Sequence, residues 1–575
     1  MKMKVLLVAM NAKYIHSNLA VYSLKAYAEQ YGNMQHEIII KEYTINQYVE
    51  EILADIYKEQ ADMVGFSCYI WNIEHIIQII RDLKAIQEDL KIFVGGPEVS
   101  YRSSQILKMY PPIDYVLCGE GEETFKQFLD SFSGESLKRN DIHGLAYREY
   151  NEIKINPLMQ PIDLSKIPFV YQNGKDFQHR ILYYETSRGC PYCCSYCLSS
   201  IDKRIRFRDL RLVKEELQFF LDHNVAQVKF VDRTFNCNPA HAMEIWKYIQ
   251  KKDNGSTNFH FEIAADLLTE EELELLSKMR PGLVQLEIGV QSVNKKTLEA
   301  IHRRTDIQKI EQITGKIKKY HNIHQHLDLI AGLPYENYES FQNSFNQVYG
   351  MKPDQLQLGF LKVLYGAGIC EESEKYGIVH SSRPPYEVLK TRWLTYDEIL
   401  ALKEVESVVE IYYNSMQFTH TIEALENHFV SPFVMYQKLG AFYQKASKGG
   451  TKHSRVRRYV LLHEFIQQQL HPQGEEQKQW EELLTFDFYL RENAKSRPNF
   501  SKDLAQYKEK IRRIYTNPKL SLKLKGYEKY STKQIEHMTH MEVIQNRYFL
   551  FDYQNRNVLT KGATVLDVTE YADIP

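Results

Sequence analysis

The chain has 575 residues, and its 72 Lys and Arg residues against 74 Asp and Glu residues give a formal net charge of −2. With 43% hydrophobic and 25% charged residues, the composition excludes collagen-like, coiled-coil and disordered proteins. The nearly neutral charge gives no general signal for nucleic-acid binding, so we do not expect nucleic acid as a partner. At roughly 100 to 200 residues per domain, this length predicts about three or four domains.

The sequence predicts a cytoplasmic protein without a membrane span. No stretch approaches the ~18 consecutive apolar residues that a spanning helix needs. The first apolar run, residues 5–10, is shorter than that of a secretory signal and Lys13 follows it, so it predicts a buried strand. Four of the 8 cysteines lie within positions 190–197. Such crowding makes a poor disulfide framework and suits a metal or cluster site in a reducing compartment.

Residues 1–140 alternate short apolar runs with helical stretches. The runs lie at 5–9, 37–40, 63–67, 92–94 and 115–118. Runs of this kind, rich in β-branched residues, predict the buried parallel strands of a Rossmann-like open α/β sheet. Ligands of such sheets bind beyond the carboxyl ends of the strands, which are followed here by residues 11–16, 67–72, 95–98 and 119–122.

After a connector at 141–175, the same alternation resumes, with strands predicted near 181–185, 227–231, 259–263, 283–288, 327–330 and 355–361. Six β/α units over residues 176–370 predict a partial TIM-like (β/α)6 barrel whose chemistry lies at the carboxyl ends of its strands. From 371 to 575, amphipathic stretches such as 395–414 and 456–469 predict a mainly helical C-terminal domain that helps to enclose a substrate. Within it, residues 541–568 alternate like strands, with a turn predicted at 555–557.

The decisive motif is the CxxxCxxC pattern of Cys190, Cys194 and Cys197. Three thiolates on a short loop can hold three irons of a 4Fe-4S cluster and leave the fourth iron open to a small chelating ligand, because full protein ligation needs four cysteines. Cys193 creates a competing CxxC frame, for which a thioredoxin-like pair or a zinc site is the alternative. The preceding strand end and the aromatic Tyr196 favour the cluster.

The segment resembles the radical S-adenosylmethionine enzymes, whose CxxxCx-aromatic-C motif is preceded in many members by Ser-Arg-Gly-Cys, here at 187–190. The resemblance implies that S-adenosylmethionine chelates the open iron and is cleaved reductively to a 5′-deoxyadenosyl radical, with Cys193 as a non-ligand neighbour. Segments 231–236, 261–268, 287–292 and 328–334 are similar to later strand ends of cobalamin-type members. The Gly-Gly-Glu triad of other members is missing, which leaves open which groups hold the methionine amino group.

Charged residues also occur inside the predicted strands of this barrel. A charge in a buried parallel strand is costly unless it is paired or engaged by a ligand. Asp232, Glu262 and Glu287 could therefore bind a cofactor, or they could form structural ion pairs with Arg303 or Arg304. The cofactor-binding residues expected in the barrel are Tyr196, Asp232, Glu262, Glu287 and Gln291, beside the catalytic and metal-binding Cys190, Cys194 and Cys197.

The N-terminal domain could bind a nucleotide, a corrin or nothing when its residues are read alone. Gly95 and Gly96 would let a flat, bulky ligand approach the backbone, whereas the two carboxylates of the GEGE segment at 119–122 would repel a phosphate. Beside the cysteine motif, the domain resembles the cobalamin-binding domain of cobalamin-dependent radical enzymes, through GFSCY at 65–69, GGPE at 95–98 and GEGEETF at 119–125. In that family the serine and glycine segments flank the slot for the dimethylbenzimidazole tail. The resemblance thus implies cobalamin-binding roles for Ser67, Gly95, Gly96, Pro97, Glu98, Gly119, Glu120 and Gly121.

This domain departs from classical cobalamin domains in one loop. The Asp-x-His-x-x-Gly sequence that supplies an axial histidine is missing, and the matching loop is residues 11–16. Many radical members leave the lower cobalt face unligated, so His16 is expected to be a structural or surface histidine.

The resemblance implies a cobalamin-dependent radical S-adenosylmethionine enzyme, a methyltransferase acting on an unactivated carbon. Cobalamin-dependent cyclisation or rearrangement without net methylation is an alternative, as is a corrin-binding sensor with a vestigial cluster. An RNA-modifying methylthiotransferase-like enzyme would need three further N-terminal cysteines, and only Cys68 and Cys118 exist. The expected partners are a small-molecule, lipid or peptide substrate and an external one-electron donor such as flavodoxin or ferredoxin.

Overall fold

The computed structural model describes residues 2–33, 36–132, 137–150, 152–171, 177, 179–447 and 453–572. The chain forms two compact units. The first unit comprises residues 1–320, 332–337 and 360–395, and the second comprises 321–331, 338–359 and 396–575.

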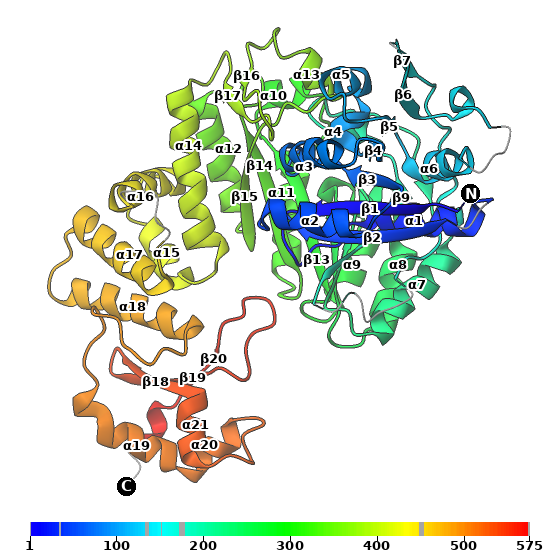
Figure 1. Cartoon of the computed structure of the whole chain (residues 1–575). Coiled ribbons are helices and arrows are strands. Elements are labelled where there is room, and N and C mark those ends of the chain that lie inside the picture. Colours follow the sequence, from blue (N-terminus) through cyan, green and yellow to red (C-terminus); the bar gives the residue numbers. More distant parts are fainter. Residues whose placement is uncertain are drawn as a thin grey trace. The chain divides into compact units, whose positions relative to one another are not determined.

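The first unit begins with a seven-stranded sheet in the order β2-β1-β3-β4-β5-β6-β7 (Figure 1). Its parallel strands are β2 (Glu37–Thr44), β1 (Lys4–Asn11), β3 (Met63–Ser67), β4 (Lys91–Gly95) and β5 (Tyr115–Leu117), which confirms the predicted Rossmann-like sheet. Two antiparallel strands, β6 (Leu145–Glu149) and β7 (Glu152–Ile155), extend the sheet from β5. Part of the segment that the sequence suggested as a connector therefore belongs to this sheet. We call the sheet and its helices the N-terminal lobe.

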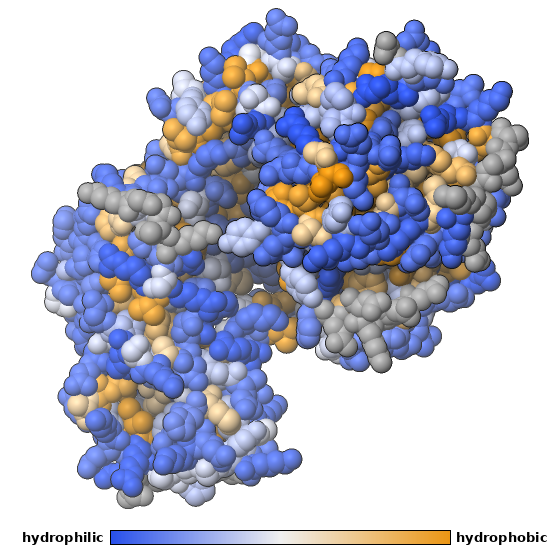
Figure 2. Space-filling view, in the orientation of Figure 1, coloured by the Kyte–Doolittle hydropathy of each residue, from blue (hydrophilic) through white to orange (hydrophobic). Residues whose placement is uncertain are grey.

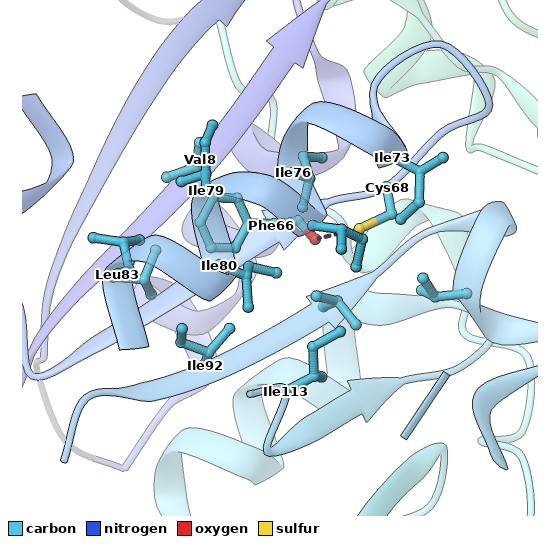
Figure 3. Close-up of a cluster of buried hydrophobic side chains, with 14 of the residues drawn as sticks. Val8, Phe66, Cys68, Ile73, Ile76, Ile79, Ile80, Leu83, Ile92 and Ile113 are labelled. Atoms are coloured by element: carbon cyan, nitrogen blue, oxygen red, sulfur yellow. Dashed lines mark hydrogen bonds between the residues drawn. The ribbon is translucent and has the colours of Figure 1, made fainter. Parts of the chain in front are cut away.

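Both faces of this sheet are buried, as its apolar runs predict. Side chains of β1 alternate between two hydrophobic clusters: Leu6, Val8 and Met10 belong to one, and Val5, Leu7 and Ala9 to the other. Figure 3 shows the first cluster, in which strand residues such as Phe66 meet isoleucines of α3 (Ile73–Ile86). The second cluster includes residues of α1 (Leu19–Tyr31) and α6 (Gly121–Asp130). Because the faces are covered, the free edge for a ligand lies at the carboxyl ends of the strands.

The second part of the first unit, which we call the cysteine lobe, contains a parallel sheet of β8 (Ile181–Tyr184), β11 (Gln227–Phe230), β12 (Asn258–Ile263) and β13 (Val284–Gln291). The helices α7 (Leu210–Asp222), α8 (Pro239–Lys252) and α9 (Glu270–Ser277) connect successive strands. The remaining predicted strands also form, as β14 (His324–Ala331) and β15 (Gln355–Phe360). Strands thus occur at all six predicted positions, and within the described ranges they close no barrel, in agreement with the predicted partial arrangement.

The second unit is mainly helical, as predicted. Its helices include α12 (Tyr338–Gly350), α14 (Tyr396–Val409), α15 (Thr419–Glu426), α16 (Pro432–Ala446), α17 (Arg455–Leu470) and α18 (Glu475–Arg491). The chain then forms a module with its own hydrophobic core, built from α19 (Lys508–Thr516), α20 (Pro518–Lys523), α21 (Thr532–Met538) and the antiparallel strands β18 (Thr539–Ile544), β19 (Arg547–Asp552) and β20 (Thr564–Asp567).

This module contains a tight hairpin turn in addition to the turn expected from the sequence. The strands β18 and β19 are joined at Gln545 and Asn546, whose φ angles are 49° and 60°. Such a pair of positive φ angles suits a two-residue hairpin. Residues 555–557 lie in the connection between the paired antiparallel strands β19 and β20, so the chain does reverse direction where the turn was predicted. The hairpin at 545–546 is a further turn that the sequence analysis did not predict. Asparagine tolerates both turn and loop conformations, so its presence alone did not locate the hairpin.

No helix in the described part of the chain is long and apolar enough to cross a membrane. Figure 2 shows a face covered mainly by hydrophilic residues, with apolar residues interspersed.

Candidate functional site

A short antiparallel pair of strands frames the cysteine loop. Strand β9 (Ser187–Arg188) pairs with β10 (Arg206–Phe207), and the loop between them carries all four clustered cysteines. Gly189 has a φ of 98°, and a Cβ there would lie 2.5 Å from the Arg204 carbonyl oxygen, so only glycine fits. The Cys190 N–H donates to the Asp202 carbonyl over 3.0 Å. These contacts hold the first cysteine at the base of the loop.

The four cysteines differ in exposure in the way that the CxxxCxxC frame predicts. Cys190 and Cys194 are 8% and 5% exposed and Cys197 is half-buried, whereas Cys193 is exposed to solvent. All four are free thiols. Burial, with a smaller contribution from Cys197 and Cys190, raises the pKa of Cys194, whereas the Arg303 guanidinium lowers it. The three cysteines of the motif are thus more sheltered than Cys193, and Cys190 and Cys197 are near enough to Cys194 to affect its pKa.

Asp232, at the carboxyl end of β11, supports the segment that leads into this loop. Its buried carboxylate accepts hydrogen bonds from Thr186 N (2.9 Å), Thr186 Oγ1 (2.6 Å) and Ser187 Oγ (2.6 Å). Burial raises the pKa of Asp232 to about 6, although these three donors oppose the shift. The contacts give Asp232 a positioning role for the cysteine loop, and its predicted contact with a cofactor stays a prediction.

We expect Asp232→Asn to destabilise the first unit by about 1–3 kcal/mol, the cost of a buried group that loses its partner. The amide lacks the negative charge that strengthens these three hydrogen bonds, and its nitrogen can pair with the Thr186 and Ser187 hydroxyls only if both reverse their roles and accept. Urea unfolding followed by circular dichroism measures the change. Unaltered unfolding of this variant would contradict the positioning role.

Arg303 is a site residue whose role the sequence did not reveal. Its Nη1 lies 3.8 Å from Cys194 Sγ and 3.3 Å from the Tyr196 hydroxyl, and Nη2 donates to the Gly289 carbonyl. Within the described residues, no carboxylate forms an ion pair with Arg303, and its buried Nε has no hydrogen-bond partner. A buried guanidinium without an anion suits an anionic ligand group.

Gln291, at the end of β13, lies beside this guanidinium. Its backbone has a φ of 71°, and its buried Oε1 has no partner among the described residues. A Cβ on Gly289 would lie 2.3 Å from Gln291 Nε2 and 3.4 Å from Arg303 Nη2, so glycine at 289 leaves room for both side chains. The structure therefore brings Gln291, Tyr196 and Cys194 together around Arg303, with polar atoms that a ligand could satisfy.

Glu262 and Glu287 lie at paired positions of β12 and β13, and their partners differ from those expected. Lys229 Nζ on β11 is 3.0 Å from Glu287 and 4.0 Å from Glu262, and His260 Nε2 is 2.9 Å from Glu287. Burial lowers the pKa of Lys229, but Glu287 and Glu262 outweigh it and raise the pKa overall. The structural ion pairs that the sequence left as the alternative to cofactor binding are formed here with Lys229, which lies on the neighbouring strand.

The predicted cobalamin-binding residues at the ends of β3 and β4 lie close together. The Asn18 side chain donates to Ser67 Oγ over 3.3 Å, and the Cys68 N–H donates to the Gly95 carbonyl over 2.7 Å. Gly96 has a φ of 105°, and a Cβ there would lie 2.6 Å from the Cys68 carbonyl oxygen. The close approach that requires glycine at 96 is thus to the protein's own backbone. Pro97 and Glu98 begin the short helix α4 (Pro97–Ser100).

The GEGE segment joins the two lobes of the first unit. Arg188, two residues before Cys190, contacts Glu122 at 2.9 Å, Glu120 at 3.4 Å and Glu185 at 2.7 Å. Arg206 forms a second ion pair with Glu120. The Glu120 carboxylate is therefore paired with arginines of the cysteine lobe.

Backbone conformation requires glycine at position 119, and packing requires it at position 121. Gly119 has a φ of 79°, and a Cβ on Gly121 would lie 2.9 Å from Leu24 of α1. The cofactor contacts expected of Gly119 and Gly121 stay predictions.

His16 also links the two lobes. The Tyr183 hydroxyl and His16 Nδ1 are 2.8 Å apart, and the Ile181 N–H donates to the Ile15 carbonyl over 2.7 Å. Burial lowers the pKa of His16, as do Lys13 and Lys229. These contacts give His16 a structural role, in line with the expectation from the sequence.

The donor set fits the cofactors that the sequence implies. Three sheltered or half-sheltered thiols are suited to soft metal centres such as iron–sulfur clusters. Beside them lie a buried guanidinium without a carboxylate partner and the unpartnered oxygen of Gln291, which suit the charged end of an amino-acid ligand.

Three family models match separate parts of the chain. The B12 binding domain covers residues 5–129, the Radical SAM superfamily covers 184–348, and a protein family of unknown function (DUF4080) covers 374–566. The chain therefore contains a B12 binding domain and a Radical SAM domain. These matches confirm the predicted family, its enzyme class and its cofactor classes of cobalamin, S-adenosylmethionine and iron–sulfur cluster.

One similar protein is the cobalamin-dependent radical SAM methyltransferase TokK of Streptomyces tokunonensis. It is 25% identical over 407 residues, which cover 65% of this chain and 58% of TokK. The chain thus spans less than two thirds of the length of that relative.

Two solved structures share the fold. TsrM of Kitasatospora setae, a radical S-adenosylmethionine methyltransferase solved with cobalamin and a [4Fe-4S] cluster, has a TM-score of 0.56 and 17% identity, covering 67% of this chain and 82% of TsrM. The cobalamin-dependent radical enzyme OxsB has a TM-score of 0.59 and 15% identity, covering 84% of this chain and 79% of OxsB.

Proposed function

We propose that this protein is a cobalamin-dependent radical S-adenosylmethionine methyltransferase that transfers a methyl group to an unactivated carbon. The observation that carries the proposal is the union, in one compact unit, of a sheltered CxxxCxxC loop with a B12-binding lobe that contacts it through Arg188. When bound, the cluster and S-adenosylmethionine would initiate the radical reaction, and cobalamin would carry the methyl group. The protein's part is to bind, orient and shelter these groups.

Each site residue has a proposed role within this function. Cys190, Cys194 and Cys197 would bind the cluster, and Arg303 would bind the methionine carboxylate by charge-assisted hydrogen bonds. Gln291 would accept from the methionine amino group through its unpartnered Oε1. The pair of Glu262 and Glu287 with Lys229 would line the same strand ends. The proposed cobalamin contacts are Ser67, Gly95, Gly96, Pro97, Glu98, Gly119, Glu120 and Gly121, whose segments end or follow strands β3, β4 and β5.

The name of one relative supports methyl transfer, since TokK is a cobalamin-dependent radical methyltransferase. The methylthiotransferase alternative is disfavoured by the core. Cys68 and Cys118 are 0% and 4% exposed and belong to one hydrophobic cluster of the N-terminal lobe, which suits buried apolar packing and not a second cluster. The proposed substrate is a small molecule, lipid or peptide, and the proposed reductant is an external one-electron donor such as flavodoxin or ferredoxin.

Anaerobic reconstitution tests the proposal. The purified chain should bind iron, sulfide and cobalamin, and under reduction it should release both 5′-deoxyadenosine and S-adenosylhomocysteine from S-adenosylmethionine. Release of 5′-deoxyadenosine without S-adenosylhomocysteine would favour cyclisation or rearrangement. Absence of both products, in protein that holds the cluster, would contradict a radical enzyme and favour a sensor.

A further inference from the structure

The region of unknown function contributes a segment to the first unit. The DUF4080 match begins at residue 374, and residues 360–395 belong to the first unit. We call residues 361–390 the strap. Its two ends are tied together, since the Val363 N–H donates to the Tyr386 carbonyl over 3.0 Å and the Val388 N–H donates to the Leu361 carbonyl over 2.9 Å. The strap is therefore an ordered loop with a fixed path.

Tyr386 joins the strap to the N-terminal lobe. Its hydroxyl donates to the Glu98 carboxylate and accepts a hydrogen bond from Arg102 Nη2 over 2.8 Å. Arg102 also pairs with Glu98. Glu98 and Tyr386 are 4% and 2% exposed, so the ion pair and the phenol are withdrawn from solvent together. In such surroundings a hydrogen bond to a charged group is among the stronger single contacts of a protein.

Two further contacts fit the strap to the same place. The Arg102 guanidinium lies 4.1 Å from the centre of the Tyr365 ring, which in turn meets the Tyr386 ring edge-on at 5.2 Å. Gly366 has a φ of 90°, and a Cβ there would lie 2.5 Å from the Tyr101 ring. A strap of another shape would not fit against the residues that follow Glu98.

The backbone of Tyr386 is itself held in an uncommon conformation. Its φ is 57°, in the left-handed region that side chains other than glycine rarely adopt. Such a conformation persists where the surrounding contacts over-determine it, and such positions concentrate at functional sites. The contacts of the Tyr386 side chain with Glu98 and Arg102 help to hold its backbone in this conformation.

Glu98 leads directly to the proposed cobalamin slot. It follows Gly95, Gly96 and Pro97, and the Glu98 N–H and the close packing of Gly96 both involve the Cys68 carbonyl. Cys68 in turn follows Ser67. The turn at 95–98 and the end of β3 are therefore one connected piece of backbone, and Tyr386 is fastened to one end of it.

We propose that Tyr386 latches the strap of the DUF4080 region onto the N-terminal lobe and holds the turn at 95–98 in the shape that retains cobalamin. Tyr386 is thus a positioning residue that acts through Glu98 and touches no cofactor. The inference rests on the proposed function, because it requires that the slot between Ser67 and the turn receives cobalamin. It assigns to the family of unknown function a role in cofactor retention.

The test is the rate at which hydroxocobalamin leaves the reconstituted full-length protein, followed by corrin absorbance during dilution into excess apo-acceptor. In Tyr386→Phe, which removes only the hydroxyl, we expect release to be about tenfold faster, in line with the loss of one hydrogen bond to a charged group. Iron content should be unchanged. Tyr376→Phe is the matched control, because this buried tyrosine of the same strap packs on Tyr335 and Trp393 and should release cobalamin at the wild-type rate.

A double variant distinguishes an effect through the Glu98–Tyr386 contact from independent effects of the two substitutions on the stability of the strap. Because Glu98→Leu removes the acceptor of the Tyr386 hydroxyl, release from Glu98→Leu/Tyr386→Phe should be no faster than from the faster single variant. Multiplied effects, or release from Tyr386→Phe at the wild-type rate, would overturn the latch. A wild-type protein that binds no cobalamin would instead overturn the proposed function, so the two failures are distinct.

Discussion

Cys194→Ala should abolish the iron–sulfur cluster and lower 5′-deoxyadenosine formation by more than about 100-fold, the scale on which catalysis fails when an essential group is removed. Cys194 is buried, and its sulfur lies 3.8 Å from Arg303 Nη1. Without its thiolate, only two cysteines of the CxxxCxxC frame remain, which are too few for a cluster with one open iron. Iron and sulfide per protein, measured after anaerobic reconstitution, report the loss directly.

Cobalamin binding should persist in this variant, because the N-terminal lobe has hydrophobic clusters of its own that contain no residue of the cysteine loop. The matched control is Cys193→Ala, which removes the solvent-exposed cysteine of the same loop and should keep iron near the wild-type amount. If Cys193→Ala lost the cluster and Cys194→Ala kept it, the ligand frame would be the competing one.

The parts predicted from sequence are those that local patterns encode. The alternation of short apolar runs located the strands of the N-terminal lobe, because both faces of a parallel sheet are buried and the runs end where the sheet ends. The cysteine spacing located the proposed metal-binding loop for a similar reason, since all four clustered cysteines lie within positions 190–197. Exposure of Cys193 then agrees with the frame that the spacing favoured.

The parts that sequence reasoning missed depend on residues far apart in the chain. Arg303 lies more than 100 positions after Cys194, so only the folded sheet brings the guanidinium to the sulfur. Lys229, by contrast, left a signal: it is a charged residue inside the short strand β11, and its neighbours in β12 and β13 carry Glu262 and Glu287. A cation and two anions on adjacent strands could have been paired before the structure was known.

The same limit applies to Glu98 and Glu120. The resemblance placed both beside cobalamin, which stays a prediction, and in the structure their carboxylates pair with Arg102 and Arg206. A carboxylate in a ligand-binding segment can hold the segment's backbone in place as readily as it can contact the ligand. Arg102 lies only four residues after Glu98, whereas Arg206 lies on β10 of the cysteine lobe and is brought to Glu120 only by the fold.

Arg188→Met should lower the free energy of unfolding by about 3–5 kcal/mol near pH 8, the cost of removing one partner from a buried ion pair. Arg188 faces Glu122, Glu185 and Glu120, and the Glu122 side chain is only 7% exposed. Methionine keeps much of the apolar stem and removes the charge. Arg547→Met is the control, because its pair with Asp567 lies at the surface and should contribute no more than about 1 kcal/mol.

The loss should depend on pH in a direction that the structure fixes. Burial would raise the pKa of Glu122, but Arg188 outweighs it and holds this pKa below its ordinary value. In the wild type, the pair therefore stabilises the fold above the unfolded-state pKa of Glu122, and this contribution is lost as pH falls through the lowered folded-state value. In Arg188→Met, only the smaller effects of a backbone hydrogen bond at Glu122 and of Arg206 oppose burial. Glu122 therefore takes up a proton more readily in the folded state, and acid reduces the cost of burying its carboxylate without Arg188. The difference between wild type and variant in urea unfolding should thus be largest near pH 8 and shrink toward pH 4.5. A difference that stayed constant over this range would show that Arg188 acts through packing, and that its charge does not join the two lobes.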